Sequence, residues 1–210
     1  MNARSIAKSA LLLGLFAAVG TALLAFVFDL TEERIIEQQR RAVLRAVNQV
    51  IPSELYDNDP FVDQIVLTDV PELGGNGPFR VFRGRSEGQP VAVAIEAIAP
   101  DGYSGDIAMM IGILTNGEIS GVRVTSHRET PGLGDRIDRN KSDWISSFDG
   151  LSLANTNDSE WAVKRDGGQF DQFTGATITP RAVVQAVHRA LVWVNDNQDR
   201  LYLTDANTQP

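Results

Sequence analysis

The chain has 210 residues, of which 43% are apolar and 22% charged, so it can bury a sizeable core and is not disordered throughout. Its 27 acidic residues outnumber the 19 basic ones, and the formal net charge of −8 argues against a nucleic-acid-binding protein, because binding phosphates requires clustered Lys and Arg. The lack of cysteine excludes a disulfide, a thiolate zinc site and a cysteine-ligated iron–sulfur cluster, so any redox chemistry requires a cofactor.

The first predicted element is a membrane anchor. The stretch Ser9–Phe28 carries no charge and is rich in Leu, Ala, Phe and Val. As a helix with a rise of about 1.5 Å per residue it would be about 30 Å long, which matches the hydrocarbon core of a bilayer. Arg4 and Lys8 precede the stretch and acidic residues begin at Asp29, so the positive-inside rule predicts a cytoplasmic N-terminus and an extracytoplasmic remainder.

A cleaved signal peptide and a buried helix of a soluble protein are the alternatives for this stretch. A signal peptide also begins with basic residues, but its apolar region usually has only ~7–15 residues. No clear Ala-x-Ala cleavage site precedes Asp29. We therefore expect a cytoplasmic tail at residues 1–8 and an uncleaved transmembrane helix at residues 9–28.

A stalk helix and a connector are predicted for residues 29–78. Thr31 is followed by two glutamates and can begin a second helix, whose apolar residues keep a broken helical period up to Ile51, before Pro52. The Pro and Gly content of residues 53–77 indicates an irregular connector, with a short strand at Ile65–Leu67.

Three aspartates of the connector, Asp57, Asp59 and Asp63, could belong to a calcium loop. Carboxylates are the ligands that calcium prefers. The spacing lacks the Gly and the closing Glu of an EF-hand, so acids on surface turns are the favoured interpretation.

Residues 79–126 carry the signals of an antiparallel sheet. The candidate strands, separated by turns, are Phe79–Arg83, Val91–Ala99, Asp106–Leu114 and Ile119–Ser126. Asn116 and Gly117 stand between two apolar runs and predict a hairpin, because both residues accept a positive φ. The run Ile107–Leu114 is almost wholly apolar, so we expect helices on both faces of this strand. One candidate is Lys141–Phe148, and the other is the last helix.

The last predicted helix runs from about Pro180 to Asn195. Thr179 is suited to be its N-cap, with Pro180 as the first helical residue. The apolar stripe of this helix consists of Val183, Val187, Ala190, Leu191 and Val194. The predicted fold class is therefore α+β, with an antiparallel or mixed sheet packed by helices in a domain at residues 79–198. A C-terminal tail follows at residues 199–210.

The first segment that could carry chemistry is the loop His127–Asp135, directly after a predicted strand. Its proline and glycines allow a tight loop whose backbone can approach a ligand. His127 is either a lone base or, as is more common at a strand end, a structural residue. His188, the other histidine, gives no metal-ligand spacing with it.

The second segment places a Gly-containing loop, Thr174–Thr177, before the last helix. The N-terminus of a helix has unpaired N–H groups and a partial positive charge, which would stabilise a phosphate. A plain capping turn is the alternative interpretation, because loops with Thr and Gly commonly precede helices.

The string Asp-Gln-Phe-Thr-Gly-Ala-Thr at Asp171–Thr177 resembles the flavinylation motif of the FMN-binding domain family. The loop His127–Asp135, the segment Gly102–Gly105 and the Asn-Gly hairpin are also similar to that family. In the family the last threonine of the motif, here Thr177, carries FMN through a phosphoester bond.

Over nearly its full length the chain resembles the family of G subunits of the Rnf (Rsx) electron-transport complex. The resemblance includes the N-terminal anchor, the string Tyr-Asp-Asn at Tyr56–Asn58, the His-x-Glu-Thr-Pro-Gly-Leu-Gly loop, Trp144 and Phe148. The related C subunit of the sodium-pumping NADH:quinone reductase shares the anchor and the threonine motif, so it remains an alternative.

The resemblance implies that a flavin transferase outside the membrane uses FAD and magnesium to place FMN on Thr177, with release of AMP. Asp171 is the residue that we expect the transferase to recognise. The residues implied to shape its approach are Thr174, Gly175 and Ala176. The loops implied to lie near the isoalloxazine ring contribute Tyr103, Ser104, Glu129, Thr130, Gly132 and Leu133. Gln172 and Thr174 stand where the family often has Gly and Ser, and neither change removes the acceptor.

The implied function is that of a membrane-anchored electron-transfer subunit in a complex that couples ferredoxin and NAD chemistry to ion translocation. The implied location is the bacterial inner membrane, with one span and a periplasmic main domain. The implied partners are other Rnf-type subunits, above all the multispanning D subunit with its own flavin, and the flavin transferase. The chain is expected to act as part of an enzyme, with no catalytic residue and no metal ligand of its own.

Two other classes of function remain open. One is an anchored subunit that assembles a membrane complex without a cofactor. The other is a periplasmic hydrolase, for which His127 and Glu129 are the candidate pair, although no nucleophile elbow or metal set accompanies them.

Overall fold

The computed structural model describes residues 3–202, and its chain divides into two compact units, Met1–Ala42 and Val43–Pro210. Residues 1 and 2 of the predicted cytoplasmic tail and residues 203–210 of the predicted C-terminal tail lie outside the described residues.

A single helix of 46 residues, α1 (Ala3–Asn48), contains the predicted span. Its part Leu11–Asn48 is long and apolar enough to cross a membrane, by length and composition. The prediction of a second helix beginning at Thr31 was wrong. The Thr31 hydroxyl donates back into the helix, to Val27 O at 2.8 Å, and no proline occurs before Pro52, so nothing interrupts α1 there. The helix ends at Asn48, three residues before the predicted end at Ile51.

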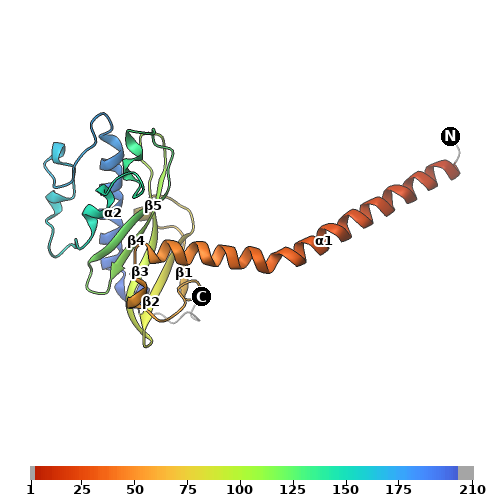
Figure 1. The fold of residues 1–210 in the computed structure, drawn as a ribbon, viewed down its shortest axis with the longest axis horizontal. Coiled ribbons are helices and arrows are strands. Elements are labelled where there is room, and N and C mark those ends of the chain that lie inside the picture. The colour runs from red at the N-terminus through yellow and green to blue at the C-terminus, as the bar shows by residue number, and fades with distance from the viewer. Residues whose placement is uncertain (1–2, 203–210) are drawn as a thin grey trace. The chain divides into compact units, whose positions relative to one another are not determined.

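Five antiparallel strands form one sheet with the order β1-β2-β3-β4-β5 (Figure 1). The strands are β1 (Gln64–Leu67), β2 (Phe79–Ser86), β3 (Gln89–Ala99), β4 (Ile107–Leu114) and β5 (Ile119–Ser126). The predicted meander is confirmed, and the predicted short strand of the connector is its edge strand. The α+β fold class is confirmed as well.

The β2–β3 and β4–β5 hairpins differ in the backbone conformation of their turns. Glu87 and Gly88, between β2 and β3, both have positive φ, 49° and 76°. This is the pattern expected at Asn116 and Gly117 from their sequence. There the hairpin exists, but only Gly117 has positive φ, 84°, and Leu114 N donates to Glu118 O across the turn at 2.9 Å. The β4–β5 loop is longer than the β2–β3 loop, so it can reverse the chain with a positive φ at Gly117 alone.

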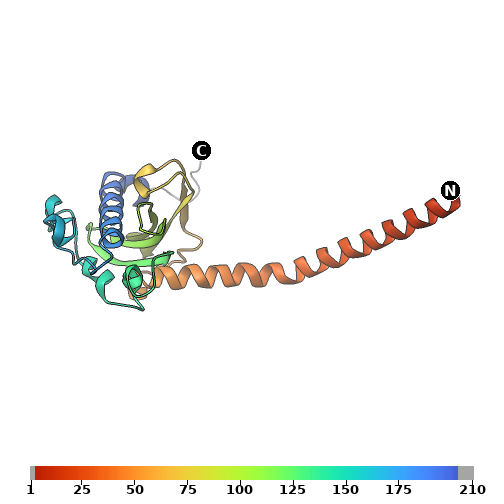
Figure 2. The ribbon, with the colours of Figure 1, turned by 90° about the horizontal axis from the view of Figure 1, so that it is seen from above.

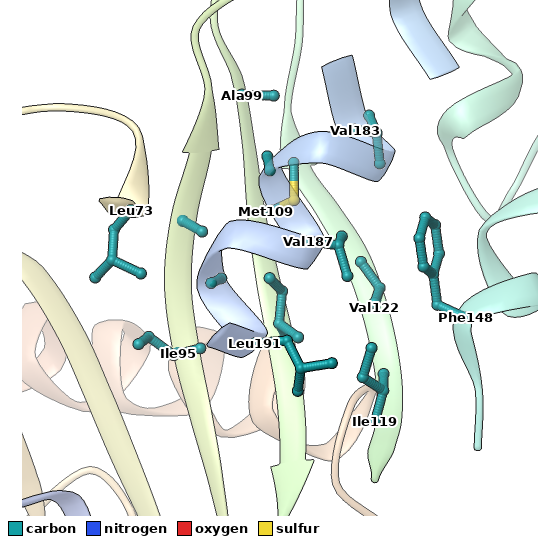
Figure 3. Packing of buried hydrophobic residues seen from close by; sticks show 14 of the residues in the cluster. Leu73, Ile95, Ala99, Met109, Ile119, Val122, Phe148, Val183, Val187 and Leu191 are labelled. Carbon is teal, nitrogen blue, oxygen red and sulfur yellow. The ribbon is translucent and has the colours of Figure 1, made fainter. Parts of the chain in front are cut away.

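The helix α2 (Ile178–Asp196) covers one face of the sheet, and the short α3 (Gln198–Tyr202) follows it (Figures 1 and 2). The predicted apolar stripe is confirmed, since all five of its residues are buried. Figure 3 shows Val183, Val187 and Leu191 packed among strand residues such as Met109 and Val122. Packing against this face decides the position of α2.

The last turn of α1 and the residues after it cover the opposite face. This second cluster consists of Val47, Val50, Ile51, Phe82, Ala92, Ala94 and Met110. β4 is therefore covered on both faces, as predicted, but the prediction that Lys141–Phe148 supplies a covering helix was wrong. That segment contains only the 3₁₀ helix η4 (Trp144–Phe148), whose Phe148 joins the α2 side of the core beside Val122 (Figure 3).

The connector between α1 and β2 is held to the sheet by side chains. The side chain of Asn58 bonds the backbone of β2 twice, to Arg83 O at 2.9 Å and from Arg85 N at 2.8 Å. Asp63 forms ion pairs with Arg83, which is 2% exposed, and with Arg85 at 2.7 Å. The expectation of an acid on a surface turn was therefore wrong for Asp63, which balances a buried guanidinium. The described residues contain no group of three side chains suited to hold a metal ion.

Candidate functional site

Three loops meet at one end of the sheet. Ala99 pairs with Ile107, and Ala108 pairs with Ser126, so the β3–β4 loop and the end of β5 are neighbours. The N-terminal half of α2 packs at the same end, with Val183 near Ala99 and Met109 (Figure 3). The sheet and α2 thereby bring together residues 100–106, residues 127–134 and the motif at 171–177.

Thr177 occupies the N-cap position of α2, with φ −70° and ψ −28°. Its side chain makes no capping hydrogen bond, and the residue is half-buried. Its carbonyl accepts the N–H of Arg181 at 3.3 Å. The hydroxyl therefore stands at the positive end of a 19-residue helix without a capping role.

Thr179 was predicted to be the N-cap, and this prediction was wrong. Thr179 is fully buried, and its hydroxyl donates to the Glu129 carboxylate at Oε2. α2 begins two residues earlier than expected, at Ile178, so Pro180 lies in its first turn, where it removes no intrahelical hydrogen bond.

Glu129, in the loop after β5, is bonded to the β3–β4 loop and to the first turn of α2. It is 4% exposed, its Oε2 accepts the Thr179 hydroxyl, and its Oε1 accepts the backbone N–H of Ser104 at 2.9 Å. Its own N–H donates to His127 Nδ1 at 3.1 Å, which gives His127 the structural role that its position at a strand end suggested. Both carboxylate oxygens are engaged within the protein.

The turn before α2 is tight. Ala176 N donates to Phe173 O at 3.0 Å, and Gly175 at the third position of this turn has φ 81°, a conformation that favours glycine. Phe173 is buried, with its ring 5.2 Å from that of Trp144, while Thr174 and Gly175 are exposed. The buried phenylalanine thus anchors a turn that exposes the middle of the motif.

Asp171, at the start of the motif, lies on the surface. Its carboxylate pairs with Lys164 Nζ at 2.6 Å, and its backbone carbonyl accepts the indole N–H of Trp144 at 2.7 Å. Nearby in the chain, Arg181 bonds Asp166 through two nitrogens, and this bond lowers the pKa of the Asp166 carboxyl. Because the Asp171 side chain is 72% exposed, another macromolecule can reach it.

Exposed apolar side chains accompany the three loops. Tyr103 is 68% exposed, Leu133 43% and Ile178 45%, and one comes from each segment around Glu129. A Cβ at Gly175 would lie 3.8 Å from Leu133 Cδ2, so the motif turn contacts the loop after β5. In that loop Thr130 O accepts the N–H of Leu133 and of Gly134, each at 3.1 Å, which closes the loop on itself.

The backbone N–H of Gly132 is also engaged in this loop, because it donates to Asp135 Oδ1 at 2.8 Å. The structure thus brings the three predicted segments, the β3–β4 loop, the loop after β5 and the motif, together at the N-terminal end of α2, whereas His188 lies farther along this helix and Asp63 lies in the connector. The buried link between Glu129 and Thr179 was missed, because a threonine directly before a proline has the local pattern of an N-cap. The one sequence feature that pointed to a close contact here is Gly134, which is buried and leaves room for the Glu129 and Thr179 side chains.

Two cavities lined by described residues lie away from these three loops. One, of about 270 Å³, is at the other end of the sheet, where Asn116, Leu191 and Tyr202 contribute to its lining. The other, of about 420 Å³, lies along the second half of α2 at His188 and Trp193. Their linings within the described residues include no residue of the motif.

His188 is part of a structural contact rather than of a site with His127. Its ring stacks on Trp161 with centroids 5.0 Å apart, and its Nε2 is 3.3 Å from Asp158 Oδ1. Burial lowers the pKa of His188, and the nearby Asp158 carboxylate offsets part of this effect.

Comparison with known families and proteins gives two family matches. Residues 102–192 match the FMN-binding domain, and residues 1–50 match the RnfG N-terminal region. The first match contains the three loops and most of α2, and the second contains α1.

Full-length relatives share one name, which describes each of them as the G subunit of the ion-translocating oxidoreductase complex. The Shewanella loihica protein is 50% identical, over 98% of this chain and 97% of the relative. The Pseudomonas aeruginosa protein is 51% identical, over 94% of this chain and 92% of its own length. A Vibrio cholerae protein is 48% identical, over 94% of both chains.

Proposed function

The chain belongs to the family of G subunits of the ion-translocating oxidoreductase complex, and from that premise we propose that it is a membrane-anchored electron-transfer subunit that carries FMN covalently on Thr177. The observation that carries the proposal is the position of the Thr177 hydroxyl, at the N-terminus of α2 and free of a capping bond.

The residues at this end of α2 fit both parts of FMN. The unpaired N–H groups of the first turn and the helix dipole favour a phosphate on Thr177. The apolar surface of Tyr103, Leu133 and Ile178 suits an isoalloxazine ring. When bound, FMN accepts or gives up one or two electrons, which is chemistry that the side chains of this chain do not supply.

The attachment requires a phosphoryl transfer. Thr177 Oγ1 forms a bond to the flavin-side phosphorus of FAD, the bond from that phosphorus to the bridging oxygen breaks, and AMP leaves with that oxygen. The hydroxyl proton of Thr177 is released to a base. We assign this step to a separate flavin transferase that recognises the exposed Asp171, with Thr174, Gly175 and Ala176 shaping its access.

The proposed location is the bacterial inner membrane. Residues 9–28 of α1 would form the span, residues 1–8 the cytoplasmic tail, and the flavin domain at residues 79–198 would lie in the periplasm, joined to the span by residues 29–78. Residues 199–210 would be a tail.

The proposed partners are the other subunits of an Rnf-type complex, in particular the multispanning D subunit with its own flavin. Because the chain has no cysteine and no Gly-x-Gly-x-x-Gly string, we place the ferredoxin and NAD sites on those other subunits. Copurification in mild detergent identifies the complex. Components of the sodium-pumping NADH:quinone reductase in the eluate would instead favour the function of the C subunit of that enzyme.

The test of the flavin proposal is direct. The full chain is coexpressed with the transferase, separated on a denaturing gel and examined for ultraviolet fluorescence and for a mass increase of one FMN less one water. Thr177→Ala should abolish the fluorescent band, whereas the matched variant Thr174→Ala should only weaken it. A band that persists in Thr177→Ala would refute this acceptor, and a wild-type chain without flavin would favour an assembly subunit without a cofactor.

A further inference from the structure

We propose that Glu129 is a positioning residue of the flavin attachment site, which acts through Thr179 and the Ser104 backbone rather than on the flavin itself. The inference rests on the function proposed above, in which Thr177 accepts FMN. It assigns Glu129 a role different from the flavin contact that the family resemblance implies.

The Glu129 carboxylate is buried and fully engaged in hydrogen bonds. Glu129 is 4% exposed, and its two oxygens accept hydrogen bonds from different elements, Oε1 from Ser104 of the β3–β4 loop and Oε2 from Thr179 of α2. Hydrogen bonds to a charged acceptor are stronger than neutral ones, and breaking them in a buried place leaves polar groups unsatisfied. The carboxylate is therefore a fixed point for the β3–β4 loop and for α2.

Thr179 is close in the chain to the proposed acceptor, Thr177. Thr179 lies two residues after Thr177, in the first turn of α2. Its bond to Glu129 holds that turn at one rotation about the helix axis. Because Thr177 is the N-cap of the same turn, the bond also holds the Thr177 backbone, from which the hydroxyl extends, at a fixed place relative to the loop surface.

Two glycines fit closely around the Glu129 carboxylate. A Cβ at Gly134 would lie 2.7 Å from Glu129 Oε2 and 2.9 Å from Thr179 Oγ1. A Cβ at Gly102 would lie 3.0 Å from Glu129 Oε1. The loops before β4 and after β5 thus approach the carboxylate so closely that only glycine fits at these two positions. This close packing fixes the carboxylate in addition to its hydrogen bonds.

The consequence for the chemistry concerns the rate of attachment. A transferase must bring the Thr177 oxygen in line with the phosphorus of FAD, and a displacement of about 1 Å from productive geometry can reduce a rate roughly 100-fold. Recognition of the chain through Asp171 does not need this precision, because Asp171 is exposed and lies before the turn Phe173–Ala176, six residues from Thr177. Loss of the link should therefore lower kcat of the transferase and leave its KM for this chain almost unchanged.

The experiment measures flavin attachment to the purified full chain in detergent, with the transferase, FAD and magnesium. Thr179→Val keeps the shape of the side chain and removes the donor, and we expect kcat to fall roughly 10- to 100-fold. Thr179→Ser retains the donor and should restore most of the rate. Gly134→Ala, which crowds the same link without changing a charge, should also lower kcat.

The matched control is Thr156→Val. Thr156 is also a buried threonine whose hydroxyl donates to a side-chain oxygen, Asn155 Oδ1 at 2.9 Å. Its loop is tied to Ile119, at the other end of β5. Thermal unfolding of both threonine variants shows how much stability each one loses, and at equal stability only Thr179→Val should be slow.

The outcomes separate this inference from the function on which it rests. Wild-type attachment rates in Thr179→Val, or an equal slowing in Thr156→Val, would overturn the positioning role while the flavin on Thr177 remains. A wild-type chain that receives no flavin, or receives it at another residue, would overturn the proposed function instead. Slow attachment in Thr179→Val with recovery in Thr179→Ser supports both.

Discussion

The backbone carbonyl of Val50 rests on Gly112 of β4, and a Cβ at Gly112 would lie 2.3 Å from its oxygen. Gly121 pairs with Gly112 across the strands, and a Cβ there would lie 3.1 Å from Val50 Cα. The Ser120 hydroxyl donates to Val50 O at 2.5 Å. Because the paired residues Gly112 and Gly121 have no side chains, the backbone at Val50, just after α1, can pack directly on the sheet.

Gly112→Ala should destabilise the protein by about 1–3 kcal/mol, because the methyl group cannot be placed without moving Val50 or the strand. Chemical unfolding of the full chain in detergent measures the change. Gly77→Ala is the control, since a Cβ at Gly77 meets nothing within 4 Å and its φ is not positive. Equal unfolding free energies for the two variants would contradict the close contact.

Asp63→Ala should destabilise the protein by about 3 kcal/mol, because it removes a carboxylate from a guanidinium that is taken out of water. Arg83 is 2% exposed, and Arg85 loses the same partner. Asp57→Ala, at an exposed residue that accepts Glu87 N at 2.8 Å, should cost only about 1 kcal/mol.

Calcium distinguishes this structural role of Asp63 from the calcium loop that the sequence left as an alternative. The melting temperature of the wild-type chain should stay the same when calcium is added. A rise that Asp63→Ala abolishes would show that the connector binds the ion after all.

His188 should make stability depend on pH. Burial lowers its pKa below the ordinary value of 6.5, so folding favours the neutral ring. Its stabilising contribution is fully present above pH 6.5 and is lost as the pH falls through the lowered folded pKa. His188→Phe keeps a ring against Trp161 and removes the titration.

The measurement is the melting temperature of the wild type and of His188→Phe between mildly acidic and neutral pH. The wild type should lose more stability than the variant on acidification. Asp158→Asn removes the charge that partly supports the protonated ring, so it should steepen the loss. Parallel curves for the wild type and His188→Phe would contradict the expected linkage.

The proposed orientation can be tested by single cysteines, because the chain has none of its own. Thr115→Cys places a thiol on the exposed β4–β5 hairpin, and Ser5→Cys places one before the apolar stretch. In intact spheroplasts an impermeant maleimide should label the first and not the second. Labelling of Ser5→Cys before lysis would reverse the orientation.

Some elements were predictable to within a residue or two because their signals are local. β5 has the predicted bounds Ile119–Ser126, and β4 begins one residue after the expected start. The apolar run of β4 and the turn at Gly117 are patterns of a few neighbouring residues, so no distant partner is needed to recognise them. The apolar stripe of α2 was predictable for the same reason.

Other elements were not predictable because their partners are distant in the sequence. Thr31 and Thr179 both have the local pattern of an N-cap, yet one hydroxyl donates into its own helix and the other to Glu129. Val47 and Val50 show helical spacing, but this spacing does not indicate which face of the sheet the two side chains cover. In each case the competing contact was invisible from the neighbouring residues.

The amino-acid sequence by itself indicated the apolar stretch, the four strands between residues 79 and 126 and the motif at Asp171–Thr177 that resembles a flavinylation motif, since each is encoded by residues close together in the chain. Only the tertiary structure decided which helix end covers which face of β4, and that one buried carboxylate joins the loops around Thr177. Apolar burial has no direction, so a local pattern states that a face is to be covered but not by what. A hydrogen bond between residues 50 positions apart exists only after the chain has packed.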